Sequence, residues 1–275
     1  MSAPLPGPEV LRLEREGQVA LLVMTDTARL NPLGLPLQQQ MRAHLAALQA
    51  DDGVRALVLT GEGKGFCVGA DLSSINDAPA AGDARSVGER TADTMHALSN
   101  PLVLDLQRLR MPVVCAINGA AAGAGAGLAL AADFTLMADS AYLLFPFLPR
   151  LGIVPDLGST WFLERRAGRA RAMGAALLGE RIAAAQAVAW GLAWSAVPDA
   201  ALREQALALA QRLTRLPAHA ALEARRALDA AARHGLSEQL HYEAERQREL
   251  VGGPSFVEGV RAFGEKREPD FGRRG

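Results

Sequence analysis

Residues 113–134 read VVCAINGAAAGAGAGLALAADF, an apolar run followed by a turn made almost wholly of glycine and alanine. Residues 113–117 have the length and composition of a buried strand, and residues 128–133 read as part of a helix. Between them, Gly123, Gly125 and Gly127 alternate with alanines. Either two backbones pack closely here, which is the commoner reason for such a stripe, or a ligand approaches the main chain.

A second turn of similar composition follows another apolar run. Residues 54–59 (VRALVL) predict a strand, and residues 65–72 (GFCVGADL) come shortly after it. The first turn of a helix has free backbone N–H groups and the positive end of the helix dipole. Two such turns that converge would aim two amides at one oxygen and form an oxyanion hole. The pair of turns therefore favours a functional interpretation.

The same turns do not fit a nucleotide-binding motif. A GxGxxG pattern that starts at Gly123 or Gly125 needs a small residue at position 128 or 130, and both are leucine. Residues 61–66 (GEGKGF) lack the Lys-Ser/Thr pair of a P-loop. The sequence thus argues against both common phosphate-binding loops.

The composition is that of an ordinary globular protein, with 49% hydrophobic and 21% charged residues among 275. A formal net charge of -1 gives no general attraction for nucleic acid or anionic lipid. Cys67 and Cys115 are too few and too far apart for a disulfide framework. Residues 1–9 predict a flexible tail without a signal-peptide pattern, and the longest apolar run, 120–132, is too short to span a bilayer. We therefore expect a cytoplasmic protein with neither nucleic acid nor membrane as a partner.

The order of predicted elements indicates an α/β fold. Residues 19–24, 54–59 and 113–117 predict strands, and residues 35–50 predict a helix because Leu37, Met41, Leu45 and Leu48 recur at helical spacing. Residues 73–100 predict a mobile loop followed by a helix. From residue 202 onward the pattern is helical, with segments at 220–233 and 237–250 that are separated by Gly235.

Five segments together resemble the crotonase, or enoyl-CoA hydratase/isomerase, superfamily: 54–72, 111–134, 151–182, 187–198 and 259–271. The resemblance implies a crotonase-like spiral of ββα units with a C-terminal helical region, assembled as a homotrimer or a dimer of trimers. It places a core with the active site at residues 10–200 and a helical trimerisation region at residues 201–275.

The resemblance also implies a binding site for an acyl-CoA thioester. The oxyanion-hole amides would be those of Ala70 and Ala124, and bulky side chains at these turns would block the thioester. The positions implied to contact the CoA part of the substrate are Gly69, Asp71, Leu72, Gly123, Phe263 and Lys266. The last two often come from a neighbouring subunit in this family; without the resemblance, their segment reads as a plain amphipathic helix.

The departures from the family pattern bear on the reaction. Hydratases of this family use two glutamates, and the positions that match them here are Gly127 and, by a less certain alignment, Phe147. The carboxylate that remains is Asp156, in IVPDLGSTW (153–161), where isomerase branches of the family carry an acidic residue. This segment most resembles ring 1,2-epoxyphenylacetyl-CoA isomerases and related enoyl-CoA isomerases. Asp156 is an equally good candidate for a helix N-cap.

These observations predict an acyl-CoA isomerase in which Asp156 is the base. Ile153, Val154, Leu157 and Trp161 are expected to surround its carboxylate and raise its pKa. Phe145, Phe147 and Trp161 indicate an apolar acyl group. No metal and no redox cofactor is implied, since CoA arrives as part of the substrate. An enoyl-CoA hydratase or lyase, and a catalytically weak CoA-binding paralogue, remain as alternatives.

Overall fold

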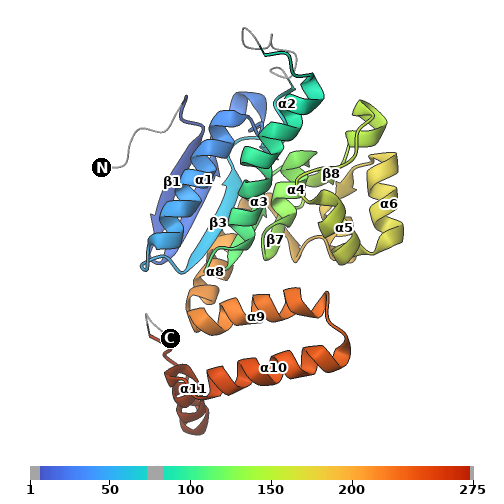
Figure 1. Ribbon diagram of the computed structural model, residues 1–275. Helices are drawn as coiled ribbons and strands as arrows, with labels where there is room; N and C mark the ends of the chain where they lie inside the picture. Colours follow the sequence, from blue (N-terminus) through green and yellow to red (C-terminus); the bar gives the residue numbers. More distant parts are fainter. Residues whose placement is uncertain (1–6, 73–82, 273–275) are drawn as a thin grey trace.

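A six-stranded sheet lies at the centre of the hydrophobic core in the computed structural model, which describes residues 7–72 and 83–272 (Figure 1). The order is β1-β2-β3-β5-β7-β10, and all neighbours are parallel except β1 and β2. Strands β2 and β5 are buried along their whole length, as expected for parallel strands covered on both faces. The strand bounds are Leu11–Glu16 (β1), Val19–Met24 (β2), Ala56–Gly61 (β3), Val113–Ile117 (β5), Phe134–Ala138 (β7) and Ser195–Val197 (β10).

A smaller, four-stranded sheet lies beside the first, in the order β4-β6-β8-β9. Its strands are Gly65–Cys67 (β4), Ala120–Ala122 (β6), Tyr142–Leu144 (β8) and Ile182–Ala183 (β9). The chain passes three times from a strand of the large sheet to a strand of the small sheet and then to a helix: β3 to β4, β5 to β6 and β7 to β8. This is the predicted spiral of ββα units, a repeat that the sequence itself does not display.

The helices between the strands cover the core. Their bounds are Leu35–Ala50 (α1), Val87–Thr94 (α2), Asn100–Gln107 (α3), Ala124–Leu130 (α4), Ser159–Ala167 (α5), Arg169–Leu178 (α6) and Ala184–Ala189 (α7). The described residues also include two π-helical turns, η3 (Met95–Ser99) and η4 (Phe147–Leu151), and two short 3-10 turns, η1 (Thr27–Arg29) and η5 (Asp199–Ala201). Helices α1 and α3 lie side by side (Figure 1).

The end of the chain is helical, as predicted from residue 202. Helix α8 (Leu202–Thr214) packs against the large sheet, whereas α9 (Ala218–Ala231) and α10 (Leu236–Val251) form a pair beyond the core, followed by α11 (Pro254–Glu265) (Figure 1). Arg225 joins α9 to the core: it pairs with Asp133 and donates to the backbone oxygens of Gln107, Leu109 and Met111. Large apolar residues on α10 and α11 remain exposed in the single chain.

Most of the expected elements are confirmed. The strands at 19–24 and 113–117 and the helix at 35–50 have the predicted bounds, and β3 begins two residues later than expected. Strand β1 was not predicted, because four of its six residues (Arg12, Glu14, Arg15 and Glu16) are charged. Residues 1–6 of the predicted tail and 73–82 of the predicted loop lie outside the described residues. The predicted boundary at residues 200–201 falls within η5 and stays a prediction.

Candidate functional site

The two glycine turns touch each other through their backbones. A Cβ atom built on Gly125 would lie 2.1 Å from the backbone oxygen of Cys67, and one built on Gly69 would lie 2.7 Å from that of Ala122. Gly69 also has a φ of +90°, which L side chains rarely adopt. Only glycine fits at these two positions. Close backbone packing, one of the two interpretations of the sequence, is therefore correct for Gly69 and Gly125.

The same packing brings two backbone N–H groups to one place. Helix α4 begins at Ala124, directly after Gly123, which has a φ of +54°, and a Cβ on Gly69 would lie 3.1 Å from the nitrogen of Ala124. The first amides of a helix have no partner within the helix. Within residues 7–72 and 83–272, no backbone hydrogen bond uses the N–H of Ala70 or Ala124. Both residues line one pocket.

This pocket has a volume of about 380 Å³. Its walls come from the start of α1, from α2 and η3, from the turns at Ala70 and Ala124, and from the turn that carries Asp156. The three residues predicted to be catalytic, Ala70, Ala124 and Asp156, thus line the same cavity although they lie far apart in the sequence. The pocket is thus lined by two residues whose amides make no backbone hydrogen bond among the described residues and by one residue with a carboxylate, the kinds of group that stabilisation of an enolate uses.

Asp156 begins a tight turn. The N–H of Ser159 donates to the backbone oxygen of Asp156 at 2.8 Å, and the two residues between them, Leu157 and Gly158, have φ values of +48° and +76°. Positive φ at both central positions is typical of a type I′ turn. A leucine in this conformation costs roughly 1 kcal/mol or more. Leu157 is 4% exposed, so burial of its side chain offsets that cost.

The carboxylate of Asp156 is partly removed from water. Burial raises its pKa from 3.8 to about 6. Its Oδ1 atom is buried and has no hydrogen-bond partner among the described residues. Of the four residues expected to surround it, Leu157 is buried, whereas Ile153, Val154 and Trp161 are 49%, 76% and 44% exposed. Helix α5 has Gly158 as its N-cap and no side-chain cap, so the interpretation of Asp156 as an N-cap is wrong.

The positions of the two hydratase glutamates are filled by packing. Gly127 is buried in α4, and a Cβ there would lie 2.8 to 3.0 Å from atoms of Leu157 and Ser159. The ring of Phe147 is 4% exposed and lies 3.7 Å from a Cβ built on Gly123. Asp71, the other carboxylate among the described lining residues, is paired with Arg29 at 2.7 Å.

The predicted CoA positions divide into two groups. Gly69 and Gly123 shape the turns, Asp71 lines the pocket, and Leu72 follows it and is 47% exposed. Phe263 lies on α11, is 88% exposed and lines a different, apolar cavity, and Lys266 follows the end of that helix. Figure 1 shows α11 at the opposite end of the molecule from α2. One chain therefore does not bring these two residues to the pocket.

The sequence named no individual side chain of α2 as part of the pocket. Val87, Arg90, Thr91 and Thr94 recur at helical spacing and present one face of α2 to the cavity. The segment Ser86–Glu89 is a capping box, a sequence signal that could have located the start of α2.

Two buried polar residues of the wall, Gln38 and Ser99, are held in place by hydrogen bonds. Ser99 donates to Gln38 at 2.7 Å, and Gln38 donates to the backbone oxygen of Leu33 at 2.9 Å. Phe145, Phe147 and Trp161, which suggested an apolar acyl group, are not among the described residues that line this pocket.

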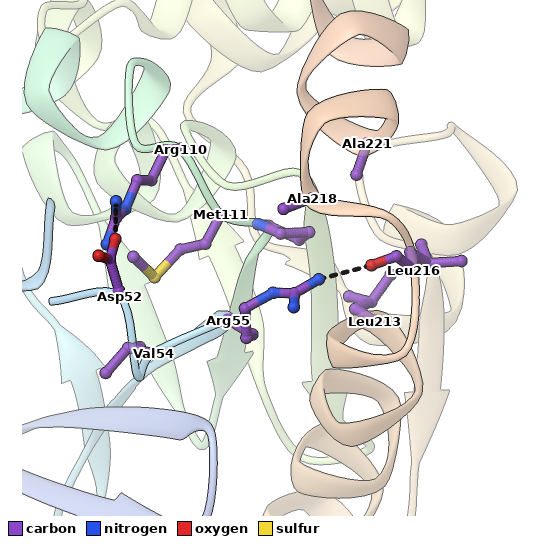
Figure 2. Close-up of a pocket in the computed structure, with 10 residues that line it drawn as sticks. Asp52, Val54, Arg55, Arg110, Met111, Leu213, Leu216, Ala218 and Ala221 are labelled. Carbon is purple, nitrogen blue, oxygen red and sulfur yellow. Dashed lines mark hydrogen bonds and ion pairs between the residues drawn. The ribbon is translucent and has the colours of Figure 1, made fainter. Parts of the chain in front are cut away.

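Another cavity, of about 390 Å³, lies at the opposite ends of the strands (Figure 2). Asp52, Val54 and Arg55 precede β3, and Met111 precedes β5, whereas binding sites of parallel sheets lie at the carboxyl ends of the strands. Figure 2 shows Arg55 bonded to the backbone oxygen of Leu216 and an ion pair between Arg110 and Asp52. The bond from Arg55 joins the core to the turn between α8 and α9, and the ion pair links two loops of the core, so we assign this cavity a structural role.

Metal binding and membrane insertion are two other classes of function. In the part of the chain that the structure describes, no cluster of three or more His, Cys, Asp or Glu side chains is arranged to hold a metal ion. None of the described helices is both long and apolar enough to cross a membrane.

Comparison with known proteins gives a consistent result. Residues 14–274 match the family model described as enoyl-CoA hydratase/isomerase. A 1,2-epoxyphenylacetyl-CoA isomerase of Escherichia coli is 41% identical over 93% of this chain and 95% of its own, and a "probable enoyl-CoA hydratase" of Rhodobacter capsulatus is 39% identical over 95% and 97%. The crystal structure of an enoyl-CoA hydratase from Bacillus anthracis superposes with a TM-score of 0.86 at 29% identity, over 96% of this chain and all of that one. The chain belongs to the enoyl-CoA hydratase/isomerase family of the crotonase superfamily.

Proposed function

We propose that this chain is an acyl-CoA isomerase, which is one form of the acyl-CoA hydratase/isomerase chemistry of its family. The reaction would shift a double bond in the acyl chain of a CoA thioester, or rearrange a ring epoxide on it. The observation that carries the proposal is the carboxylate of Asp156, which among the described lining residues is the one not held in an ion pair, in a pocket that is also lined by Ala70 and Ala124.

In the proposed mechanism, the thioester oxygen accepts hydrogen bonds from the N–H groups of Ala70 and Ala124. The carboxylate of Asp156 removes a proton from a carbon of the acyl chain, and the electron pair moves toward the thioester oxygen to give an enolate. The two amides stabilise that negative charge. Asp156 then returns the proton to a different carbon. One base removes and returns the same number of protons, and the reaction involves no net oxidation or reduction.

Hydration makes a different demand on the site. It requires groups that deprotonate a water molecule and protonate a carbon, which the family's hydratases achieve with two glutamates. Gly127 has no side chain, Phe147 cannot carry a proton, and Asp71 is paired with Arg29. A pKa of about 6 suits Asp156 to accept and return a proton near neutral pH. These features favour isomerisation over hydration.

The names of the relatives include both isomerases and hydratases. The Escherichia coli relative is named as an isomerase and the Rhodobacter capsulatus relative as a hydratase, at nearly equal identity. Family membership alone therefore does not choose between the reactions. The argument for isomerisation rests on the carboxylate of Asp156 in the pocket. A protein that binds acyl-CoA with little catalysis would have the same two amides.

The test compares two substrates with the same enzyme. A 3-enoyl-CoA should be converted to the conjugated 2-enoyl-CoA, with a rise in the absorbance of the conjugated thioester. Crotonyl-CoA should lose that absorbance only slowly. Asp156→Asn should lower the isomerase kcat by about 10²- to 10⁴-fold. Asp139→Asn, at an exposed turn residue after β7, is the control and should change nothing.

Each contrary result favours one alternative. Rapid hydration of crotonyl-CoA would identify a hydratase. Full activity of Asp156→Asn would remove Asp156 from the mechanism. Tight binding of acyl-CoA without turnover of any isomerisable acyl-CoA offered, including an epoxide substrate, would identify a binding paralogue.

The assembly is also part of the proposal. We expect a homotrimer or a dimer of trimers, in which Phe263 and Lys266 of one chain reach the CoA of another. The exposed apolar residues of α10 and α11, such as Leu236, Leu240 and Phe263, support burial against a second copy. Sedimentation analysis measures this directly. The proposed reaction uses no metal or redox cofactor, and a cytoplasmic location stays a prediction.

A further inference from the structure

Gly127 lies against the turn that carries Asp156. A Cβ atom at this position would be 2.8 Å from Oγ of Ser159, 2.9 Å from the backbone oxygen of Leu157 and 3.0 Å from its Cβ. Real Cβ atoms essentially never approach other atoms closer than 3.0 Å. Any side chain at 127 would therefore push residues 156–159 away from α4.

This contact is located one helical turn from the candidate oxyanion hole. Ala124 and Gly127 are three residues apart on α4, so they lie on the same face of the helix. The amide of Ala124 and the docking point of the Asp156 turn therefore belong to one rigid element. The distance between the amide and the carboxylate depends on how closely Leu157 approaches Gly127.

The turn at residues 156–159 has an energetically unfavourable backbone conformation. Leu157 keeps a φ of +48° while its side chain is buried, and Oγ of Ser159 is buried without a hydrogen-bond partner among the described residues. Neither feature stabilises an isolated turn. The turn lies directly against the bare backbone at Gly127, with Leu157 and Ser159 as its contacting residues.

Resting on the proposed function, we propose that Gly127 is a positioning residue for the base. Because it has no side chain, the turn 156–159 docks on α4, and this docking sets where the carboxylate of Asp156 stands relative to the amides of Ala70 and Ala124. A carboxylate side chain at 127 and the observed placement of Asp156 are therefore mutually exclusive. The position of the family's first glutamate has no side chain here because Leu157 and Ser159, in the turn that carries the alternative base, occupy the space next to it.

The first test is Gly127→Ala, which adds one methyl group at the contact. The isomerase kcat should fall by about 10- to 100-fold, because a displacement of about 1 Å at a reacting group has this effect. The affinity for a saturated acyl-CoA, which reports on the two amides, should stay within about twofold of wild type. Gly174→Ala is the matched control: it is a glycine in α6 whose added Cβ would contact nothing within 4 Å.

A second variant covers the case in which Gly127→Ala does not fold. Leu157→Gly tolerates the positive φ and leaves α4 unchanged, but it removes the buried side chain that holds the turn. Its kcat should also fall by about 10-fold or more. Wild-type kcat in either variant would overturn the proposal. An equal loss of kcat and of acyl-CoA affinity in Gly127→Ala would assign Gly127 to the amide turns instead.

A crystal structure of Gly127→Ala decides the placement without any turnover. We expect residues 156–159 to move by roughly half an ångström or more while Ala70 and Ala124 stay in place. Movement of α4 with a fixed Asp156 turn would contradict the proposal. Wild-type protein that turns over no substrate, or fully active Asp156→Asn, would instead overturn the proposed function, and this structure would still test the positioning.

Discussion

Asp156→Asn should make the protein more stable at alkaline pH while it removes activity. Burial raises the pKa of Asp156 from 3.8 to about 6, so the folded protein holds this proton more tightly than the unfolded chain does. The stability that the protonated group contributes is fully present below pH 4 and is lost as the pH rises through about 6. Above that pH the folded protein carries a poorly solvated charge, which asparagine lacks.

The size of the effect follows from the pKa. One pKa unit corresponds to about 1.4 kcal/mol, so the ionised carboxylate costs the folded state at most about 3 kcal/mol. Part of the side chain still reaches water, which reduces the expected cost to about 2 kcal/mol. For a chain of this size, that amounts to several degrees in Tm.

Thermal unfolding of wild type and Asp156→Asn at pH 8 and pH 4 measures this difference. The variant should have the higher Tm at pH 8, and its advantage should shrink toward zero at pH 4. Asp139→Asn, which changes an exposed carboxylate, should show no such pattern. A variant that is equally or less stable than wild type at pH 8 would refute the claim that Asp156 is held in a desolvated state.

Three further predictions test the site and its support. The kcat/KM of the isomerase reaction should fall below a pH of about 6 with the slope of one proton, because the base must be ionised, and a pH profile of the wild type measures this. Ala124→Pro should lower kcat by about 10²- to 10³-fold with little change in Tm, since proline suits the first position of a helix but has no N–H group; unchanged kcat would exclude this amide from the reaction. Arg225→Met should lower the free energy of unfolding by about 3 kcal/mol in denaturant titration, because it strips Asp133 and the backbone oxygens at the start of β5 of their shared partner.

The fold was largely predictable because its core strands carry strong local signals. Residues 19–24 and 113–117 are uninterrupted apolar runs, and such runs suit parallel strands buried on both faces. Strand β1 was not predicted because it has few apolar residues. Its charged residues form ion pairs at the edge of the sheet, as Glu14 does with Arg203. The π-helical turns η3 and η4 have no sequence signal of their own, since they depend on how the chain meets the core.

The site was predictable where the backbone dictates the residue and less so elsewhere. Close backbone contacts allow only glycine at positions 69 and 125, so these glycines in the sequence indicate that two backbones pack closely there. The role of Asp156 stayed open because a proline and a following helix suit a cap as well as a base. The position of the Asp156 side chain relative to the first turn of α5 depends on the positive φ of Leu157, and no sequence pattern predicts that φ.

The contact between Gly125 and the backbone of Cys67 has a consequence for how such a protein can change. The part of the pocket that would grip the thioester consists of peptide groups, which every amino acid carries, so point substitutions among the surrounding side chains cannot easily abolish it. The acid and base groups stand on separate segments that can be exchanged one at a time. Proteins with this fold can therefore acquire new reactions while the peptide groups that bind the thioester stay the same. A protein designer can likewise move carboxylates within the pocket without rebuilding the thioester site.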